Sequence, residues 1–202
     1  MTQLFLVRHG ETDWNVTQRF QGQSDVPLNE NGHQQAAAIA QRLAAEQIHA
    51  IYASDLSRAW DTASAIASHH EIDIAAEPRL REGSFGQWEG ATYDELQQRH
   101  PEAVKAWHED LGSFAPPDGE TLHQLAARVA SFYEHIQTKP QDETVLLVAH
   151  GGSLQILICH LLEIPIEKFW QFNLAHCSLS KISIYDEGAI INLLNDTSHN
   201  FE

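Results

Sequence analysis

The chain has little cysteine and no long apolar run. Its 202 residues include only two cysteines, Cys159 in the apolar run LQILICHLL and Cys177 in AHCSLS. Such usage favours buried, reduced thiols over a disulfide framework. No apolar run approaches the roughly 18 residues of a membrane span, and the N-terminus has neither the basic nor the long apolar region of a secretion signal. We therefore expect a cytoplasmic protein without a membrane partner.

Positive charge is also scarce. Twelve Lys and Arg residues stand against twenty-eight Asp and Glu residues, which gives a formal net charge of −16. Because such a surface repels nucleic acid, we expect no nucleic-acid partner. Any function that binds an anion must then depend on a local concentration of positive side chains.

Metal-binding motifs are missing despite thirteen histidines. Neither an H-E-x-x-H sequence nor a pair of C-x-x-C motifs occurs, and these are common spacings of zinc ligands. His69 and His70 lie at the end of a predicted helix, away from the strand ends where ligands bind. We predict neither a metal ion nor a cofactor.

Short apolar segments alternate with helical segments along the chain. Strands apolar enough to be buried in a parallel sheet are predicted at 4–7, 50–54 and 144–149. Helices are predicted at 27–47, 55–70 (with Asp55 or Ser57 as the N-cap), 122–137 and 153–162. Strands with period-two alternation follow at 178–186 and 189–196. This order predicts an α/β fold, a three-layer α/β/α sandwich around a mostly parallel sheet, as a single domain over residues 1–202.

A small helical cap is predicted as an insertion at about 83–126. The segment has few cations, Arg99 and Lys105, but many aromatic residues: Phe85, Trp88, Tyr93, Trp107 and Phe114. One interpretation is that most of these rings form the core of the cap. The other is that they face a substrate with one phosphate and an apolar or neutral remainder.

Positive side chains stand near the ends of three predicted strands. Arg8 and His9 follow the first strand, and Arg58 lies in the first turn of the helix after the second. His150 follows the third. Ligands of open α/β sheets bind beyond the carboxyl ends of the strands, so parallel neighbours would bring these groups together. Two guanidinium and two imidazole groups suit a tetrahedral dianion, and phosphate is the leading candidate.

Each of these residues has a more ordinary interpretation when taken alone. A single histidine at a strand end is more often structural than catalytic, and a lone arginine is usually a surface charge. Burying four potential cations without an anionic ligand is costly, however, and this makes a chance convergence a poor explanation. Neutral donors and close backbone approach are expected from the neighbouring loop and helix start, at Thr12, Asn15, Gln21, Gly22 and Gly151.

Four motifs between positions 7 and 152 resemble those of the histidine phosphatase superfamily, which includes the phosphoglycerate mutases. They are RHGET with the DWN that follows it, SDLSRAWDTA, LREGSFGQWEG and VAHGG. The resemblance implies that His9 is a nucleophile that forms a phosphohistidine. It also implies that Arg8, Arg58 and His150 hold the phosphate oxygens, with Asn15 completing the shell.

The resemblance assigns proton transfer to Glu82. This carboxyl would protonate the leaving oxygen and then accept a proton from water. Two alternatives are that Glu82 only forms an ion pair with Arg79 or Arg81, and that Glu89 is the acid instead. The position of Glu82 within its motif favours Glu82.

The motifs favour a metal-independent phosphomonoesterase that acts on a small phosphorylated metabolite. LREGSFGQWEG with PPDGETLHQLAARV resembles α-ribazole 5′-phosphate phosphatases, and IPIEKFWQFNLAHCSLSKISI resembles metal-independent phosphoserine phosphatases and broad-specificity relatives. A cofactor-dependent phosphoglycerate mutase is the main alternative, although its cap would need more basic residues. A second is a non-catalytic module that binds phosphorylated ligands.

Two features stay open at this point. The final TSHNFE is either a disordered end or a segment that brings His199 over the pocket. The oligomeric state is either monomer or homodimer.

Overall fold

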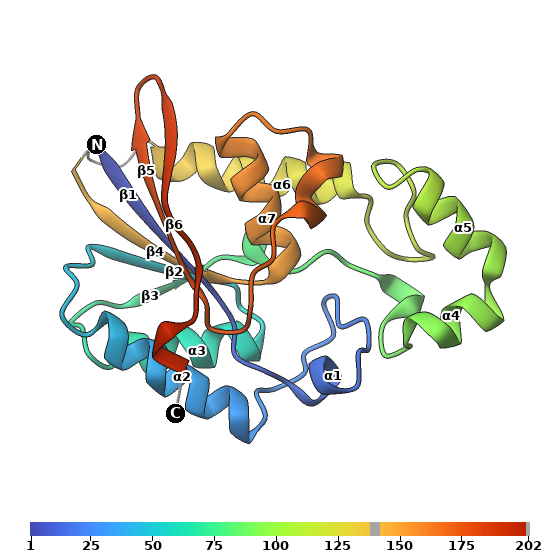
Figure 1. Ribbon diagram of the computed structural model, residues 1–202, viewed down its shortest axis with the longest axis horizontal. Helices are drawn as coiled ribbons and strands as arrows, with labels where there is room; N and C mark the ends of the chain where they lie inside the picture. The colour runs from blue at the N-terminus through green and yellow to red at the C-terminus, as the bar shows by residue number, and fades with distance from the viewer. Residues whose placement is uncertain (138–141, 201–202) are drawn as a thin grey trace.

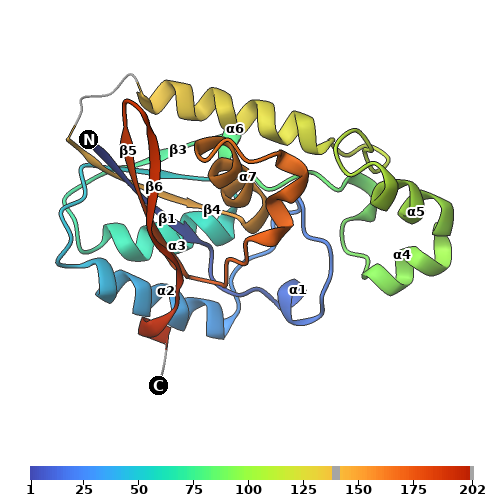
Figure 2. The same ribbon diagram turned by 45° about the horizontal axis from the view of Figure 1, so that its top comes forward.

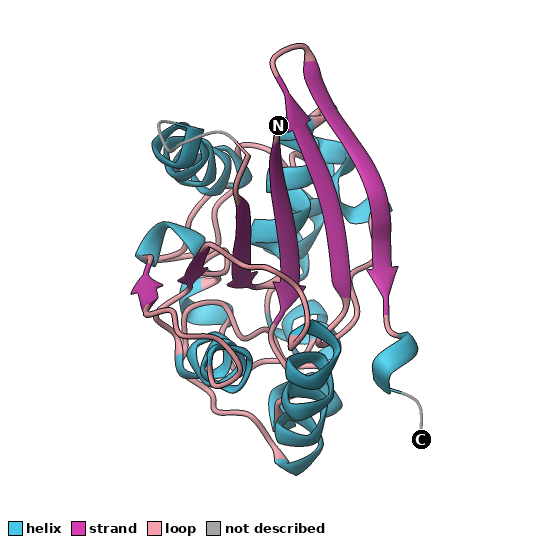
Figure 3. Ribbon diagram, turned by 90° about the vertical axis from the view of Figure 1, so that its left-hand side faces the viewer, coloured by secondary structure: helices cyan, strands magenta, loops and turns pink. Residues whose placement is uncertain are grey.

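The structure is a computed structural model that describes residues 1–137 and 142–200. It contains a six-stranded sheet in the order β3-β2-β4-β1-β5-β6 (Figures 1 and 3). The parallel strands are β1 (Thr2–Arg8), β2 (Ala50–Ala53), β3 (Ile74–Ala76) and β4 (Thr144–Ala149). An antiparallel hairpin at one edge comprises β5 (Leu179–Tyr185) and β6 (Gly188–Asp196). The predicted α/β fold with a mostly parallel sheet is confirmed.

Helices cover both faces of the sheet. One face carries α2 (Glu30–Leu43) and α3 (Ser57–Ala67), and the other carries α6 (Leu122–Gln137) and α7 (Gly151–Leu161) (Figure 2). Alternate residues of β1 serve the two layers. Leu4 and Leu6 lie in the core with α6 and α7, whereas Phe5 and Val7 lie in the core with α2 and α3. The continuous apolar strand follows from this burial on both sides.

Strand register brings the carboxyl ends of three strands to one level. β1 pairs with β4 so that Arg8 lies opposite Ala149, and β2 pairs with β4 so that Ala53 lies opposite Val148. The three strands are therefore parallel neighbours, the arrangement that would bring the groups at their ends together. His9, Ser54 and His150, which follow them, start from the same edge of the sheet.

Beyond this edge lies a small helical unit (Figures 1 and 2). It contains α4 (Tyr93–Arg99) and α5 (Pro101–Glu109), and its own core is built on Trp88, Leu96 and Val104. The α6 helix already belongs to the main body, because Leu125 packs in the core beneath the sheet. The predicted cap boundary at about 126 thus falls within α6.

Short helices complete the fold. They are α1 (Asp13–Val16), η1 (Pro78–Leu80), η2 (Gly86–Trp88), η3 (Ile166–Gln171) and η4 (Ser198–Asn200). Over residues 1–137 and 142–200, no helix is both long and apolar enough to cross a membrane.

The start of α3 differs from the expectation. Neither Asp55 nor Ser57 is its N-cap, which is Leu56 without a capping side chain. Asp55 instead accepts hydrogen bonds from Arg81, and the free N–H of Ser57 donates to Asp25 at 2.7 Å. The cap is supplied from another loop, and local sequence cannot reveal such a partner.

Candidate active site

His9 lies directly after β1 with only 3% of its surface exposed. Its Nδ1 is 2.7 Å from the carbonyl oxygen of Gly10, and because a carbonyl only accepts, Nδ1 carries the hydrogen. The neutral ring then has its lone pair on Nε2. Burial, followed by the charges of Arg8 and Arg58, lowers the pKa of His9 well below its usual value. His9 is thus held as a neutral imidazole with an available nucleophilic nitrogen.

Two arginines lie near this histidine, Arg58 fully buried and Arg8 partly buried. Arg58 donates to the carbonyls of Gly22 at 2.7 Å and Ser24 at 2.9 Å, and Arg8 donates to that of Leu174 at 2.6 Å. The Nε of each arginine is buried and has no hydrogen-bond partner among the described residues. Burial lowers the pKa of both, and the nearby Glu82 carboxyl acts in the opposite direction. Unpaired buried N–H groups of this kind call for an anion that accepts from them.

His150 completes the group as the N-cap residue of α7. It is fully buried, and its ring centroid is 5.1 Å from that of His9. Its Nε2 is 2.8 Å from the hydroxyl oxygen of Ser54, while its Nδ1 has no partner within the described part of the chain. Burial first, and then Arg58, lowers the pKa of His150 well below its usual value. A neutral His150 can therefore serve as a hydrogen-bond donor beside His9.

Glu82 reaches the same place from the segment after η1. Its two carboxyl oxygens accept hydrogen bonds from the N–H groups of Gly83 at 2.9 Å and Gly152 at 3.0 Å. A Cβ built on Gly151 would lie 3.7 Å from Arg8 Nε and 3.9 Å from Glu82 Oε2. The carboxyl group and the Arg8 guanidinium therefore border the same glycine at the start of α7.

The ion pairs considered for Glu82 are not formed. Arg79 pairs with Glu77 at 2.6 Å, and Arg81 pairs with Asp55 at 2.5 Å. Both arginines are thus engaged elsewhere, which leaves the Glu82 carboxyl to the site.

Glu89, the competing acid, has a structural position. Its carboxyl oxygens accept from the N–H groups of Gln23, Ser24 and Phe85 at 2.8–3.1 Å and from the Ser24 hydroxyl at 2.5 Å. With four donors, the Glu89 carboxyl holds in place the loop whose carbonyls bind Arg58. Because Glu89 is occupied in this way, the geometry favours Glu82 over Glu89 as the candidate acid.

Comparison with known proteins identifies the family. Residues 4–197 match the histidine phosphatase superfamily (branch 1). The chain belongs to this family. It is an enzyme of the phosphatase class.

Relatives of this histidine phosphatase are named for different activities. This chain is 34% identical to phosphoserine phosphatase 1 of Hydrogenobacter thermophilus, over 98% of this chain and 94% of that protein. It is 36% identical to a probable phosphoglycerate mutase of Photorhabdus laumondii, over 98% and 95%. The crystal structure of a putative α-ribazole-5′-phosphate phosphatase from Escherichia coli superposes with a TM-score of 0.92 at 30% identity, over 96% of each chain.

The loop after β1 carries four of the predicted binding residues. Thr12 is buried, and its hydroxyl lies 3.0 Å from both Asn15 Oδ1 and Gln21 Oε1. Gly22 has φ of +53°, and its carbonyl receives Arg58. The predicted binding residues of this loop are therefore tied to one another or to Arg58, and direct contact with phosphate stays a prediction for them.

His176 is a site residue that the motifs did not indicate. Its ring centroid is 6.0 Å from that of His9, and its Nε2 is buried with no partner among the described residues. Burial, followed by Arg8, lowers its pKa to about 4. The residue precedes β5, which pairs antiparallel with β1, so it comes to lie beside the end of β1. Its place depends on the pairing of β5 with β1, two strands far apart in the sequence, so no local sequence signal indicates it.

A pocket of about 190 Å³ opens beside Glu82 toward the helical cap. Within the described residues, no lysine, arginine or histidine lines it. Its apolar walls include Phe85, Trp107, Leu111, Phe114 and Phe169. Phe85, Trp107 and Phe114 also pack in the cap core, and Trp88 lies in that core alone. Contact of these rings with a substrate stays a prediction.

His199 does not line this pocket. Its Nε2 is 2.8 Å from the carbonyl oxygen of Cys177, on the backbone next to His176. The predicted role of the C-terminal segment extends to positions 201 and 202, which lie outside the described residues. Over residues 1–137 and 142–200, no group of three or more His, Cys, Asp or Glu side chains is arranged to hold a metal ion.

Proposed function

We propose that this histidine phosphatase hydrolyses small phosphomonoesters without a metal ion, through a phosphohistidine at His9. The observation that carries the proposal is a neutral imidazole within the electrostatic reach of two arginines, whose buried Nε–H groups have no partner in the described part of the chain. Phosphoryl transfer depends mainly on positioning and on neutralising the phosphate charge. Here the side chains of Arg8, Arg58 and His150 supply both.

The reaction takes two steps. In the first, the lone pair of His9 Nε2 attacks phosphorus, the ester P–O bond breaks, and Glu82 gives its proton to the leaving oxygen. In the second, water attacks the phosphohistidine, Glu82 takes a proton from that water, and the P–N bond breaks. Inorganic phosphate leaves, and both residues return to their starting states.

The pocket beside Glu82 supports a substrate class. The leaving alcohol departs on the side of Glu82, and the walls there are largely apolar with no cation among the described lining residues. An ester of a neutral or apolar alcohol fits such walls better than one with a second acidic group. The relatives' names offer α-ribazole 5′-phosphate and phosphoserine as candidates beside broad specificity.

The mutase alternative has less support. A phosphoglycerate mutase must hold a second acidic group while the phosphoenzyme waits, and the described residues that line the pocket include no cation to pair with it. The non-catalytic alternative would not require a nucleophile and an acid together, and both His9 and Glu82 stand at the site. The two free and buried cysteines support a cytoplasmic location.

The test is phosphate release from a panel of esters in the presence of EDTA. The panel contains α-ribazole phosphate, phosphoserine, 3-phosphoglycerate and p-nitrophenyl phosphate, each also run with His9→Ala. We expect release that EDTA does not diminish and that falls at least about 10³-fold in the variant. Loss of activity in EDTA that Mg²⁺ restores would contradict the metal-free reaction, and faster interconversion of phosphoglycerates than phosphate release would indicate a mutase.

A further inference from the structure

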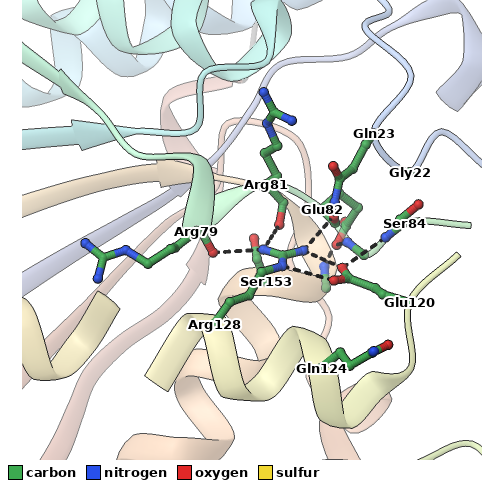
Figure 4. A network of polar contacts seen from close by, with 12 residues as sticks. Gly22, Gln23, Arg79, Arg81, Glu82, Ser84, Glu120, Gln124, Arg128 and Ser153 are labelled. Carbon is green, nitrogen blue, oxygen red and sulfur yellow. Dashed lines mark hydrogen bonds and ion pairs between the residues drawn. The ribbon is translucent and has the colours of Figure 1, made fainter. Parts of the chain in front are cut away.

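Arg128, on α6, is the centre of a polar network beneath Glu82 (Figure 4). Its side chain is 19% exposed, and all five of its N–H donors have partners. Two reach the Glu120 carboxyl, from Nε at 3.1 Å and from Nη2 at 2.5 Å. The other three reach the carbonyl oxygens of Arg79 (2.8 Å), Arg81 (2.6 Å) and Glu82 (2.8 Å).

These three carbonyls belong to the segment that carries the acid. After η1 ends at Leu80, the segment has no regular structure to satisfy its backbone groups. Arg128 supplies the donors at one point. Apart from Arg128, the carbonyl of Glu82 receives only a 3.2 Å bond from Gln23 among the described contacts. The backbone from which the Glu82 side chain projects is thus fixed chiefly by one guanidinium.

Glu120 extends the same hold to the other side of Glu82. Its Oε1 accepts from the N–H of Ser84 at 3.0 Å, and its own N–H donates to the Ser84 carbonyl at 2.9 Å. The Arg128–Glu120 pair therefore hydrogen-bonds to the backbone on both sides of Glu82. Its Glu120 member also lines the pocket proposed for the leaving group.

We infer that Arg128 is a positioning residue that aims the Glu82 carboxyl at the leaving oxygen. The inference rests on the acid role of Glu82 in the proposed function. A misplacement of about 1 Å in a reacting group costs on the order of 100-fold in rate, so loosening this segment should weaken proton donation specifically. Lysine cannot replace the arginine, because three donors on one nitrogen cannot serve five acceptor positions spread around a planar fork.

The test compares two esters that differ in their need for a proton. A p-nitrophenolate leaves without one, whereas an alkoxide such as that of 2-phenylethyl phosphate requires it. The quantity is kcat/KM, which reports the steps up to the first irreversible one and so excludes the later hydrolysis of the phosphohistidine. For Arg128→Lys we expect a loss of about tenfold or more with 2-phenylethyl phosphate and less than about threefold with p-nitrophenyl phosphate.

Arg79→Gln is the matched control. The Arg79 side chain binds Glu77 and the Ser131 carbonyl in the same region but makes no contact with Glu82. We expect Arg79→Gln to lower the free energy of unfolding, as measured in urea. The ratio of the two kcat/KM values should stay unchanged. Glu120→Gln, which weakens the grip without removing the arginine, should shift the ratio in the same direction as Arg128→Lys and by less, and it serves if the lysine variant does not fold.

Glu82→Gln separates the inference from the function on which it depends. A loss of about 10²-fold or more for the alkyl ester alone supports the acid role. Equal losses for both esters in Glu82→Gln would overturn the acid role of Glu82, and the inference about Arg128 would fall with it. If Glu82→Gln discriminates between the esters while folded Arg128→Lys and Glu120→Gln lower both equally, only the positioning role is wrong.

Discussion

The reactivity of His9 comes from its surroundings. A free histidine is partly protonated near neutrality, whereas here burial and two arginines favour the neutral form. The Gly10 carbonyl then selects the tautomer that has its lone pair on Nε2. Charge, burial and one hydrogen bond thus prepare the same nitrogen for attack.

His176 gives a prediction about stability and pH. Its pKa is about 4 in the folded protein, and an unfolded histidine titrates near 6.5. Between these values the unfolded chain binds more protons, so the free energy of unfolding falls as the pH drops from about 6.5 to about 4. His176→Gln should lose less stability over this range than the wild type. Urea unfolding at pH 7 and pH 5 measures the difference, and parallel losses in both proteins would refute it.

Sequence reasoning at the residue scale worked where motif and strand end coincide. Arg8, His9 and His150 come directly at the ends of strands whose register brings them together, and Arg58 follows closely. Arg128 and His176 had no such signal. The first acts through carbonyls of a distant segment, and the second depends on the pairing of β5 with β1, so only the folded chain reveals them.

The start of α7 is the element that places the Glu82 carboxyl beside the Arg8 guanidinium. Its N–H at Gly152 binds Glu82, and a Cβ on Gly152 would lie 2.4 Å from Glu82 Oε1. Gly152→Ala must therefore displace the acid, and we expect kcat/KM for an alkyl phosphate to fall about tenfold or more. Gly151→Ala is the matched variant, because its Cβ would make its nearest contact at 3.7 Å, to Arg8 Nε. An equal or larger loss in Gly151→Ala would contradict this account.

Strands and helices could be predicted where their hydrophobic pattern extends over many residues. The buried strands and the helices α6 and α7 follow from apolar runs and helical periodicity. Strand β3 was not predicted, since three residues at a sheet edge leave no pattern to detect. The C-terminal boundary of the cap is hard to place from sequence, because it falls in one continuous helix, Leu122–Gln137. The first turns of this helix line the pocket, and the helix packs on the sheet along its length.

At the scale of the whole molecule, the net charge of −16 surrounds a small buried cationic site. Such a surface gives phosphorylated substrates no favourable long-range steering. Salt at physiological strength screens over about 8 Å and should shield the repulsion while leaving the buried site little affected. We expect kcat/KM to stay within about twofold or to rise between low and physiological salt. A steep fall would reveal a basic approach path.

The whole-molecule charge also explains what composition could and could not predict. The negative net charge led us to expect no nucleic-acid binding and to expect that any anion site would need a local cluster of positive side chains. The structure does bring Arg8 and Arg58 close to the same histidine. The identity of the leaving alcohol depends on a pocket formed by the cap, α6, α7 and η3 together. Those walls come from four separate stretches of sequence, so their shape could not be predicted from any one of them.

The central claim is that phosphate is transferred to His9. The most direct measurement mixes the enzyme with p-nitrophenyl phosphate, quenches within milliseconds in alkali, which preserves phosphohistidine, and locates the phosphoryl group by peptide mass spectrometry. The account predicts a phosphoryl group on the peptide that contains His9, formed as fast as p-nitrophenol is released and missing in His9→Ala. Rapid p-nitrophenol release with no phosphorylated His9 peptide would show that water attacks the ester directly, and would contradict the account.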